Sequence, residues 1–429
     1  MKVILNNVQV KAVASWLPKN ILEMVSLGAE YGDTEVANIM KATGVERARI
    51  ADKDMCSSDM CQKAAEALME KDGINKDEID GLVFVSQTCD WILPSTSIAL
   101  QDRLGLSKDT VCIDIHYGCS GFIYGLFQAA SWITTGACKN VLVLAGDTTS
   151  RMMNPNDKSL RMVFGDCGTA SLVTVGNTSM GFHIQSDGSG ADRLIVPAGG
   201  FRLPVSEETS VLKWDEDKNG RTMNDLFMDG MAIFNFAITE VHKNVNSLIE
   251  YMDWVKEDVG FYALHQANEF MVNYVRKKLK VAAEVAPANC KDYGNTGPAT
   301  IPFLLSDVCS QKLHKVKGSI VHISSISVHT GYKGLAMYAS SKGALEAFSK
   351  DTAREWGSLG IRSNVVVPGF MATAMSSTLT EEQRGKIYAR TSLKAATSIR
   401  SVAETVAFLV SEKAESITGQ NIHVDNGTI

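Results

Sequence analysis

The chain has 429 residues, of which 45% are hydrophobic and 21% are charged, and its formal net charge is −6. These values are ordinary for a globular protein of two or three domains, and the slight acidic excess gives no bulk attraction to nucleic acid or to a membrane surface. The sequence shows neither an apolar run of the roughly 18 residues that a membrane span needs nor a signal peptide. Its nine cysteines, without CxxC pairs or zinc-ligand spacing, favour reduced thiols in a cytoplasm.

The N-terminal part of the chain alternates between apolar runs of strand length and amphipathic segments of helix length. This order predicts layered α/β structure in which the strands are buried on both faces. The predicted strands are Val3–Ile21, Ile79–Ser86, Val111–Ile115 and Asn140–Gly146, and the predicted helices are Asp54–Lys71, Pro94–Leu104 and Gly121–Thr135.

The middle of the chain repeats this order after a segment of mixed charge. Residues 202–226 show little periodicity and are interpreted as a surface excursion or lid, and a long helix is expected over Phe227–Tyr251. A short strand is expected at Phe261–Leu264, and a glycine-rich turn at 292–297 precedes a helix that reaches about Lys312. The sequence therefore predicts two similar α/β halves that face each other.

Three side chains with complementary chemistry follow elements of these halves. Cys119 lies between glycines where the strand Val111–Ile115 turns into a helix, and a helix N-terminus favours a thiolate. His265 can accept a proton or hydrogen-bond an oxyanion, and the amide of Asn295 can donate to a developing enolate without titrating. Each residue alone has an ordinary structural alternative: a buried thiol, a satisfied histidine or a turn asparagine. Because ligands of α/β proteins bind beyond the carboxyl ends of strands, the three together favour thioester chemistry.

The motifs around these residues resemble those of ketoacyl-ACP synthase III, a family with the thiolase fold. Their order and spacing match over about residues 1–312. The motifs are Gly118-Cys119-Ser120-Gly121-Phe122, Phe164-Gly165-Asp166, His265-Gln266-Ala267-Asn268 and Tyr293-Gly294-Asn295-Thr296.

The resemblance implies a step of fatty acid biosynthesis, the decarboxylative condensation of an acyl-CoA with malonyl-acyl carrier protein. It implies a homodimer and no cofactor beyond the coenzyme A thioester substrate. Cys119 would be the acyl-accepting nucleophile, and His265 and Asn295 would bind the malonyl thioester carbonyl and assist decarboxylation. Asn268 would contact the pantetheine arm, and Lys158 would lie near the CoA nucleotide.

A second set of residues follows Lys312 and carries different chemistry. Tyr338 and Lys342 lie four residues apart on one predicted helical face, and Ser325 ends the predicted buried strand Gly318–Ser325. Together with the segments 361–373 and 417–427, these residues resemble the C-terminal half of a short-chain dehydrogenase/reductase, and most closely a 3-oxoacyl-ACP reductase. The resemblance implies catalytic roles for Ser325, Tyr338 and Lys342 and NADP(H) as the cofactor.

Both resemblances are incomplete at the point where they meet. The sequence contains no counterpart of the two strands and glycine-rich loop with which a synthase of this family normally ends. It also lacks the glycine-rich loop that grips a dinucleotide in the reductases. We expect a thiolase-like half at 1–176, a truncated second half at 177–316 and a partial Rossmann-type segment at 317–429. We further expect the strand 318–324 to be shared between the two parts.

Three functions are compatible with this organisation. The first is a synthase III-type condensation through a Cys119 acyl-enzyme. The second is an NADPH-dependent 3-oxoacyl-ACP reductase, which requires a dinucleotide site that the sequence does not supply. The third is an inactive fusion or scaffold that binds a partner without turnover.

Overall fold

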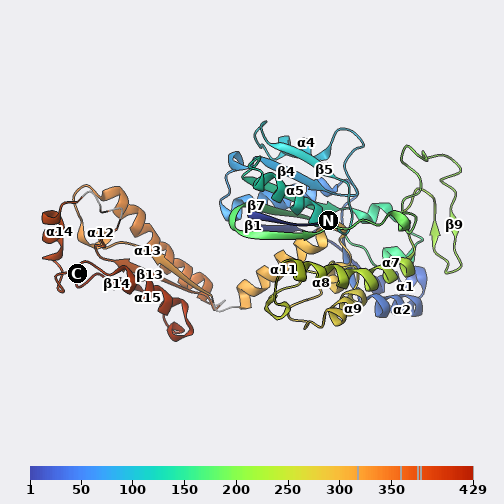
Figure 1. Cartoon of the computed structure of the whole chain (residues 1–429). Coiled ribbons are helices and arrows are strands. Elements are labelled where there is room, and N and C mark those ends of the chain that lie inside the picture. Colours follow the sequence, from blue (N-terminus) through green and yellow to red (C-terminus); the bar gives the residue numbers. More distant parts are fainter. Residues whose placement is uncertain (316–317, 358–359, 374–375, 377–378, 429) are drawn as a thin grey trace. The chain divides into compact units, whose positions relative to one another are not determined.

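The chain divides into two compact units, Met1–Asp307 and Val308–Ile429 (Figure 1). The computed structural model describes residues 1–315, 318–357, 360–373, 376 and 379–428. The predicted domain boundary between residues 316 and 317 lies outside the described residues. Among the described residues, no helix combines the length and apolar composition needed to cross a membrane.

A five-stranded mixed sheet forms the centre of the first unit. β4 is parallel to both of its neighbours, β5 and β6, whereas β7 is antiparallel to β1 and β6. In spatial order the strands are β1 (Lys2–Trp16), β7 (Cys167–His183), β6 (Asn140–Asp147), β4 (Gly81–Val85) and β5 (Val111–Ile115).

Helices cover both faces of this sheet, as the apolar pattern predicts. Alternate side chains of β4 point to opposite faces: Leu82 and Phe84 pack with α3 and α4, while Val83 and Val85 pack with α5. The helices that build these layers are α3 (Ser57–Asp72), α4 (Thr96–Arg103) and α5 (Gly121–Thr134).

β5 departs from the prediction that every strand is buried. Val111 and Ile113 are 46% and 37% exposed. β5 is the outermost strand and pairs only with β4, so its far edge faces away from the sheet. The apolar run therefore marks an exposed edge strand rather than a central one.

Smaller elements flank this sheet. β2 pairs with β3, β8 pairs with β11, and β9 pairs with β10. Their bounds, with those of the neighbouring short helices, are β2 (Asn20–Glu23), α1 (Gly28–Tyr31), α2 (Asp33–Thr43), β3 (Arg47–Ile50), α6 (Lys158–Arg161), β8 (Leu194–Ile195), β9 (Lys213–Trp214), β10 (Gly220–Arg221) and β11 (Phe227–Met228).

The predicted second half does not repeat the first. The prediction of a strand at Phe261–Leu264 is wrong. These residues form a loop, in which the Tyr262 N–H donates a 2.7 Å hydrogen bond to the Val285 carbonyl. β4, by contrast, has a strand on each side. A strand exists only as part of a ladder, and no strand of the described residues pairs with this segment.

Helices dominate this half instead. The long helix predicted over 227–251 begins only at Gly230, after β11, and the turn Ala237–Val241 within it has the π-helical hydrogen-bonding pattern. Tyr262 and Leu264 are buried among apolar side chains of α8 and α9. The helices are α7 (Gly230–Phe236), α8 (His242–Tyr251), α9 (Glu269–Leu279), α10 (Cys290–Tyr293), η7 (Gly297–Ala299) and α11 (Thr300–Lys315).

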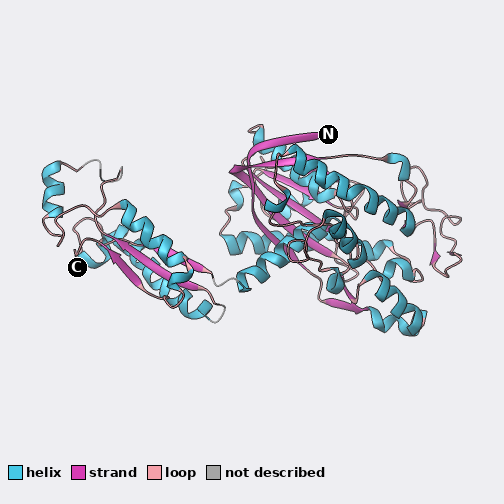
Figure 2. Cartoon of the chain, turned by 60° about the horizontal axis from the view of Figure 1, so that its bottom comes forward, coloured by secondary structure: helices cyan, strands magenta, loops and turns pink. Residues whose placement is uncertain are grey.

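The second unit contains a parallel three-stranded sheet in the order β12–β13–β14, with strands drawn magenta in Figure 2. β13 is central and fully buried, whereas β12 is only half-buried. β12 pairs with β13 in this sheet, and the sharing of this strand between the two parts stays a prediction. The elements are β12 (Ser319–Ile323), α12 (Ser327–Thr330), α13 (Ala336–Trp356), β13 (Arg362–Pro368), α14 (Glu381–Tyr388), α15 (Ile399–Val410) and β14 (Asn421–Val424).

Candidate active site

Cys119 lies in the turn between β5 and the N-terminus of α5, two residues before Gly121. A Cβ at Gly121 would lie 2.5 Å from a methyl carbon of Val85 and 3.5 Å from Cβ of Pro298. The first turn of α5 therefore packs closely on both β4 and η7. This close approach brings the cysteine turn to the segment between Asn295 and Thr300.

The Cys119 thiol is neutral near pH 7 in this environment. Burial raises its pKa to about 11, and the negative charge of Asp147 adds to the increase. Desolvation therefore outweighs the stabilisation of a thiolate that its place at a helix N-terminus predicts. The nucleophile has to lose its proton as it attacks.

Asn295 is held by its backbone beside the Phe164-Gly165-Asp166 motif. Its N–H donates to the Val163 carbonyl at 2.8 Å, and its carbonyl accepts from the Gly165 N–H at 3.0 Å. In the side chain, Oδ1 accepts a 3.0 Å hydrogen bond from the Gly297 N–H. Because a backbone N–H can only donate, this bond fixes the amide orientation and leaves the Asn295 NH₂ group as the outward donor.

His265 is attached to the same segment through Thr300. Its Nδ1 lies 2.6 Å from Thr300 Oγ1, which in turn lies 3.1 Å from the Gly297 carbonyl oxygen. Burial lowers the pKa of His265 to about 4, so the imidazole is neutral near pH 7. Its Nε2 is buried and has no hydrogen-bond partner among the described residues. His265 and Asn295 thus meet on the segment 295–300, and the helix that follows Cys119 packs against Pro298 of the same segment.

Asp147, at the end of β6, is a buried acid beside this site that the sequence analysis missed. Its Oδ1 accepts hydrogen bonds from the Ser86 hydroxyl, the Gln87 N–H and both the N–H and hydroxyl of Thr88, at 2.8–3.2 Å. Its Oδ2 has no partner among the described residues and would lie 2.8 Å from a Cβ at Gly297. The sequence did contain a signal for Asp147: a carboxylate at the end of a buried strand, a position comparable to that of Cys119 after its own strand.

Replacing Asp147 by asparagine is expected to change how stability depends on pH. Burial raises the pKa of Asp147 from its ordinary value of 3.8 to about 7, so the folded protein binds this proton more tightly than the unfolded chain. The folded state therefore loses stability as pH rises from about 4 to about 7. Urea titrations across this range should show the free energy of unfolding of D147N rising relative to wild type and levelling off above pH 7. A difference that stays flat would contradict the buried acid, and taking the difference cancels the opposite contribution of His265.

Lys158 and Asn268, the predicted substrate contacts, both have partners within the protein. The Lys158 ammonium donates to the backbone carbonyl of Asp217 and lies 3.7 Å from the Glu35 carboxylate. Asn268 Oδ1 caps α9 by accepting from the Met271 N–H at 2.8 Å. Their roles toward substrate remain predictions.

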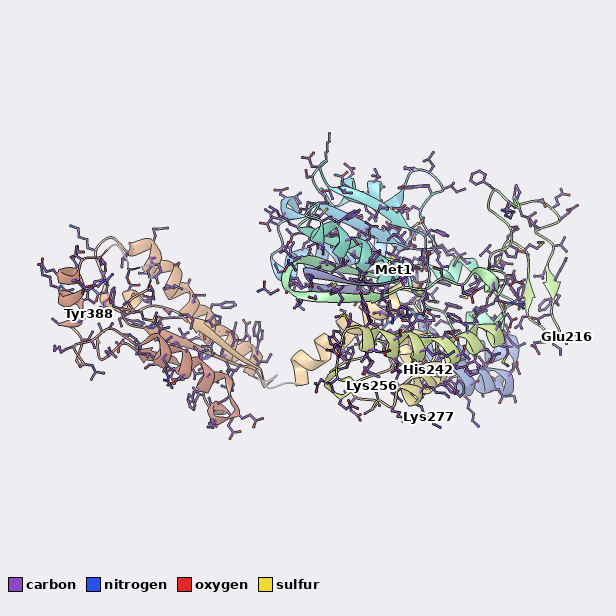
Figure 3. All side chains as sticks on the ribbon, viewed as in Figure 1. Met1, Glu216, His242, Lys256, Lys277 and Tyr388 are labelled. Carbon is purple, nitrogen blue, oxygen red and sulfur yellow. The ribbon has the colours of Figure 1, made fainter. Side chains whose placement is uncertain are left out.

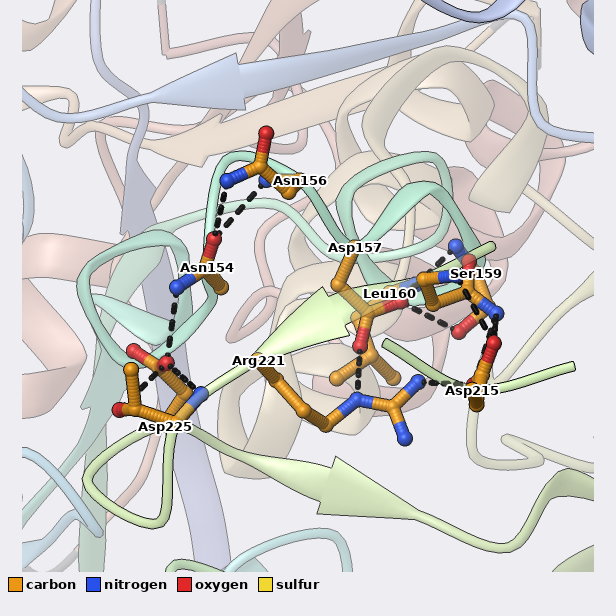
Figure 4. A network of polar contacts seen from close by, with 10 residues as sticks. Asn154, Asn156, Asp157, Ser159, Leu160, Asp215, Arg221 and Asp225 are labelled. Atoms are coloured by element: carbon orange, nitrogen blue, oxygen red, sulfur yellow. Dashed lines mark hydrogen bonds and ion pairs between the residues drawn. The ribbon is translucent and has the colours of Figure 1, made fainter. Parts of the chain in front are cut away.

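The excursion predicted at 202–226 is anchored to the start of α6. Arg221 donates to Asp157 Oδ2 at 2.9 Å and to Asp215 Oδ2 at 2.8 Å, in the polar network of Figure 4. Figure 3 shows Glu216 at the end of the β9–β10 hairpin that this network supports. The Asp157 carboxylate is almost fully buried, so this ion pair is shielded from solvent, unlike a pair at the surface.

The reductase-like residues all lie in the second unit. Lys342 Nζ donates to the Ile323 carbonyl at 2.9 Å and lies 5.9 Å from the centre of the Tyr338 ring. Ser325 Oγ accepts from the Ser327 N–H at 3.2 Å and from its hydroxyl at 3.0 Å. Among the described residues no hydrogen bond joins Ser325 to Tyr338, so the structure brings together the tyrosine and lysine but does not complete a proton relay.

Three family profiles match the chain. A profile described as 3-oxoacyl-(acyl-carrier-protein) synthase III matches residues 113–188, and that of the C-terminal part of the synthase matches residues 249–338. A profile described as enoyl-(acyl carrier protein) reductase matches residues 299–428. The profile of the synthase C-terminal part and the reductase profile overlap over residues 299–338, which include α11 and β12.

Individual relatives agree with the synthase profiles. The chain is 33% identical over 310 residues to a beta-ketoacyl-(acyl-carrier-protein) synthase III from Caldanaerobacter subterraneus subsp. tengcongensis, a match that covers 72% of this chain and 90% of the relative. A synthase III from Streptococcus sanguinis is 33% identical over 318 residues, covering 73% and 94%. Among solved structures, a 3-oxoacyl-(acyl-carrier protein) synthase from Burkholderia xenovorans has 35% identity and a TM-score of 0.68, covering 74% of this chain and 89% of that one. The chain therefore belongs to the beta-ketoacyl-(acyl-carrier-protein) synthase III family and has its thiolase-like α/β fold.

Proposed function

We propose that the first unit condenses an acyl-CoA with malonyl-acyl carrier protein through an acyl thioester on Cys119. The observation that supports the proposal is that His265 hydrogen-bonds to the segment 295–300, which contains Asn295, and that the helix following Cys119 packs against Pro298 of that segment. The relatives named as synthase III support the same reaction. The condensation uses no cofactor.

The first half-reaction transfers the acyl group to the protein. The Cys119 sulfur attacks the thioester carbonyl of the acyl-CoA, loses its proton and expels the CoA thiol. The new bond is again a thioester, so the energy for the later carbon–carbon bond is retained. The backbone N–H of Cys119 is proposed to stabilise the oxyanion of this step.

The second half-reaction uses His265 and Asn295 as hydrogen-bond donors. The malonyl thioester oxygen would accept from His265 Nε2–H and from the Asn295 NH₂ group. When the bond to the carboxylate breaks and CO₂ leaves, the electron pair moves onto this oxygen as an enolate. The enolate carbon then attacks the Cys119 thioester, and the sulfur leaves as a thiolate. Two neutral donors suit this charge because they do not repel it.

Partner and domain assignments extend the proposal. The exposed edge of β5, with Val111 and Ile113, supports a homodimer formed along this strand. We assign residues 1–176 and 177–316 to the two thiolase-like halves and 317–429 to a partial short-chain dehydrogenase segment. The parallel order of β12, β13 and β14 and the reductase profile over 299–428 support the last assignment. The eight described cysteine side chains, all free thiols, support a cytoplasmic setting.

A reductase activity of the second unit is the alternative, favoured by Lys342 lying beside Tyr338 on α13. One assay separates the functions: acyl-CoA and malonyl-acyl carrier protein are incubated with the full chain, with and without NADPH, and products are identified by mass. We expect 3-oxoacyl product in both reactions. A 3-hydroxyacyl product with NADPH would assign reductase activity to the second unit as well. The absence of any condensation product would reject the synthase.

A further inference from the structure

We propose that Asp147 exchanges a proton with Cys119 in each reaction cycle. Its carboxylate accepts the proton when the sulfur attacks the acyl-CoA and returns it when the sulfur leaves. The inference rests on the proposed condensation and supplies the destination of the thiol proton. Asp147 is the last residue of β6 and is fully buried.

The two oxygens of the Asp147 carboxyl group have different surroundings. Oδ1 accepts hydrogen bonds from the hydroxyls of Ser86 and Thr88 and from the N–H groups of Gln87 and Thr88. Oδ2 is buried and has no partner among the described residues. Because four donors already point at Oδ1, a proton on this side chain has to reside on Oδ2. One oxygen therefore anchors the group, and the other is free to gain and lose a proton.

The carboxyl group of Asp147 lies against both parts of the site. The Gln87 N–H donates to Oδ1, and the Gln87 side chain packs on the cysteine turn, where a Cβ at Gly118 would lie 2.4 Å from Gln87 Oε1. Oδ2 would lie 2.8 Å from a Cβ at Gly297, whose φ of +61° also favours glycine. The two glycines thus let this carboxyl group and its loop approach the cysteine turn and the segment 295–300 at once.

The proton affinities of the site agree with such an exchange. Burial lowers the pKa of His265 to about 4 and raises the pKa of Asp147 to about 7, so Asp147 is the stronger base of the two. A group with a pKa near the working pH is suited both to accept a proton and to return it. The negative charge of Asp147 also acts on the thiols of Cys61, Cys89 and Cys119. Their pKa values are raised to about 12, 11 and 11, so all three are neutral near pH 7.

The protons balance over the two half-reactions. In the first, the S–H bond of Cys119 breaks as sulfur bonds to the acyl carbon, the proton moves to Asp147 Oδ2, and the departing CoA thiolate takes a proton from water. In the second, the enolate attacks, the bond between sulfur and the acyl carbon breaks, and the Oδ2–H bond gives its proton back to the sulfur. The thiol and the carboxylate are restored, and one proton from water has been consumed, as the release of CO₂ from a carboxylate requires.

The test follows each half-reaction as a function of pH in the wild type and in Asp147→Asn. Asparagine keeps an oxygen for the four donors but cannot exchange a proton. In the wild type, acyl-enzyme formation should rise with pH through about 7, because the carboxylate is the accepting form. Reaction of the acyl-enzyme with malonyl-acyl carrier protein should fall across the same range, because the carboxylic acid is the donating form. D147N should lose both slopes and be slower by about 100-fold in each half-reaction, within the usual contribution of a proton-transfer group.

Asp80→Asn is the matched control. Asp80 accepts from the N–H groups of Lys139 and Asn140 at the start of β6, the end of that strand opposite Asp147. D80N should keep both slopes. Infrared spectra of the resting protein add a readout without turnover: a carboxylic acid band that D147N lacks should fade in the wild type as pH rises through about 7.

The proposal is overturned if both wild-type half-reactions respond to pH in the same direction, if D147N keeps the wild-type slopes, or if the infrared band is missing. The wild-type slopes decide the question even if D147N does not fold. A wild type that forms no acyl-enzyme would reject the condensation and the exchange together. An acyl-enzyme that forms and condenses without these opposite slopes would reject the exchange alone.

Discussion

The Cys119→Ala variant is expected to gain no mass when incubated with an acyl-CoA, whereas the wild type gains one acyl group per chain. The variant loses the sulfur that becomes acylated and leaves only a methyl group, so the loss should be complete rather than partial. Intact-protein mass spectrometry measures both proteins directly.

Cys112→Ala provides the matched control. Cys112 lies on β5, a few residues from the nucleophile, and is partly exposed, so it tests whether any nearby thiol is acylated. It should accept the acyl group like the wild type. An equal adduct on the Cys119→Ala variant would show that acylation occurs elsewhere and would remove the basis of the assignment.

The His265→Ala variant is expected to lose condensation by a factor of about 10² to 10³, the range measured when an oxyanion donor is removed. Acyl-enzyme formation on Cys119 should survive, because His265 acts on the malonyl thioester in the second half-reaction. The two half-reactions are followed separately, by protein mass and by release of CO₂ from malonyl-acyl carrier protein.

His242→Ala serves as the control for this variant. His242 begins α8 and lies outside the hydrogen-bonded chain from His265 through Thr300 to Gly297. It should condense at the wild-type rate. If the His265→Ala variant also lost acylation, His265 would belong to the first half-reaction, and the division of labour proposed above would be incorrect.

Local patterns predicted much of the first unit. β4 and β6 were predicted because their apolar runs are buried on both faces, and the turn at Cys119 because glycines bracket it. The predicted strand Phe261–Leu264 failed for a physical reason: burial can be read from a run of residues, but a ladder also needs a neighbouring strand. The same limit applies to β5: its apolar run predicted a strand, but the place of that strand at the edge of the sheet depends on its neighbours.

The site shows a similar division. Cys119, His265 and Asn295 stand out because their chemistry is visible in the residue itself. Thr300 and Asp147 do not, because their roles depend on partners distant in sequence: Thr300 meets His265 across 35 residues, and Asp147 meets Ser86 across 61. A hydroxyl or a carboxylate in a sequence carries no indication of such a partner.

The proposed condensation site lies in a unit whose second half has, among its described residues, no counterpart of the five-stranded sheet of the first. The most direct measurement is a chase on the full chain: the acyl-enzyme is formed with an acyl-CoA, free acyl-CoA is removed, and malonyl-acyl carrier protein is added without NADPH. We predict that the acyl mass leaves Cys119 while an equal amount of 3-oxoacyl-acyl carrier protein appears. An acyl-enzyme that persists, or that hydrolyses without forming this product, would contradict the account.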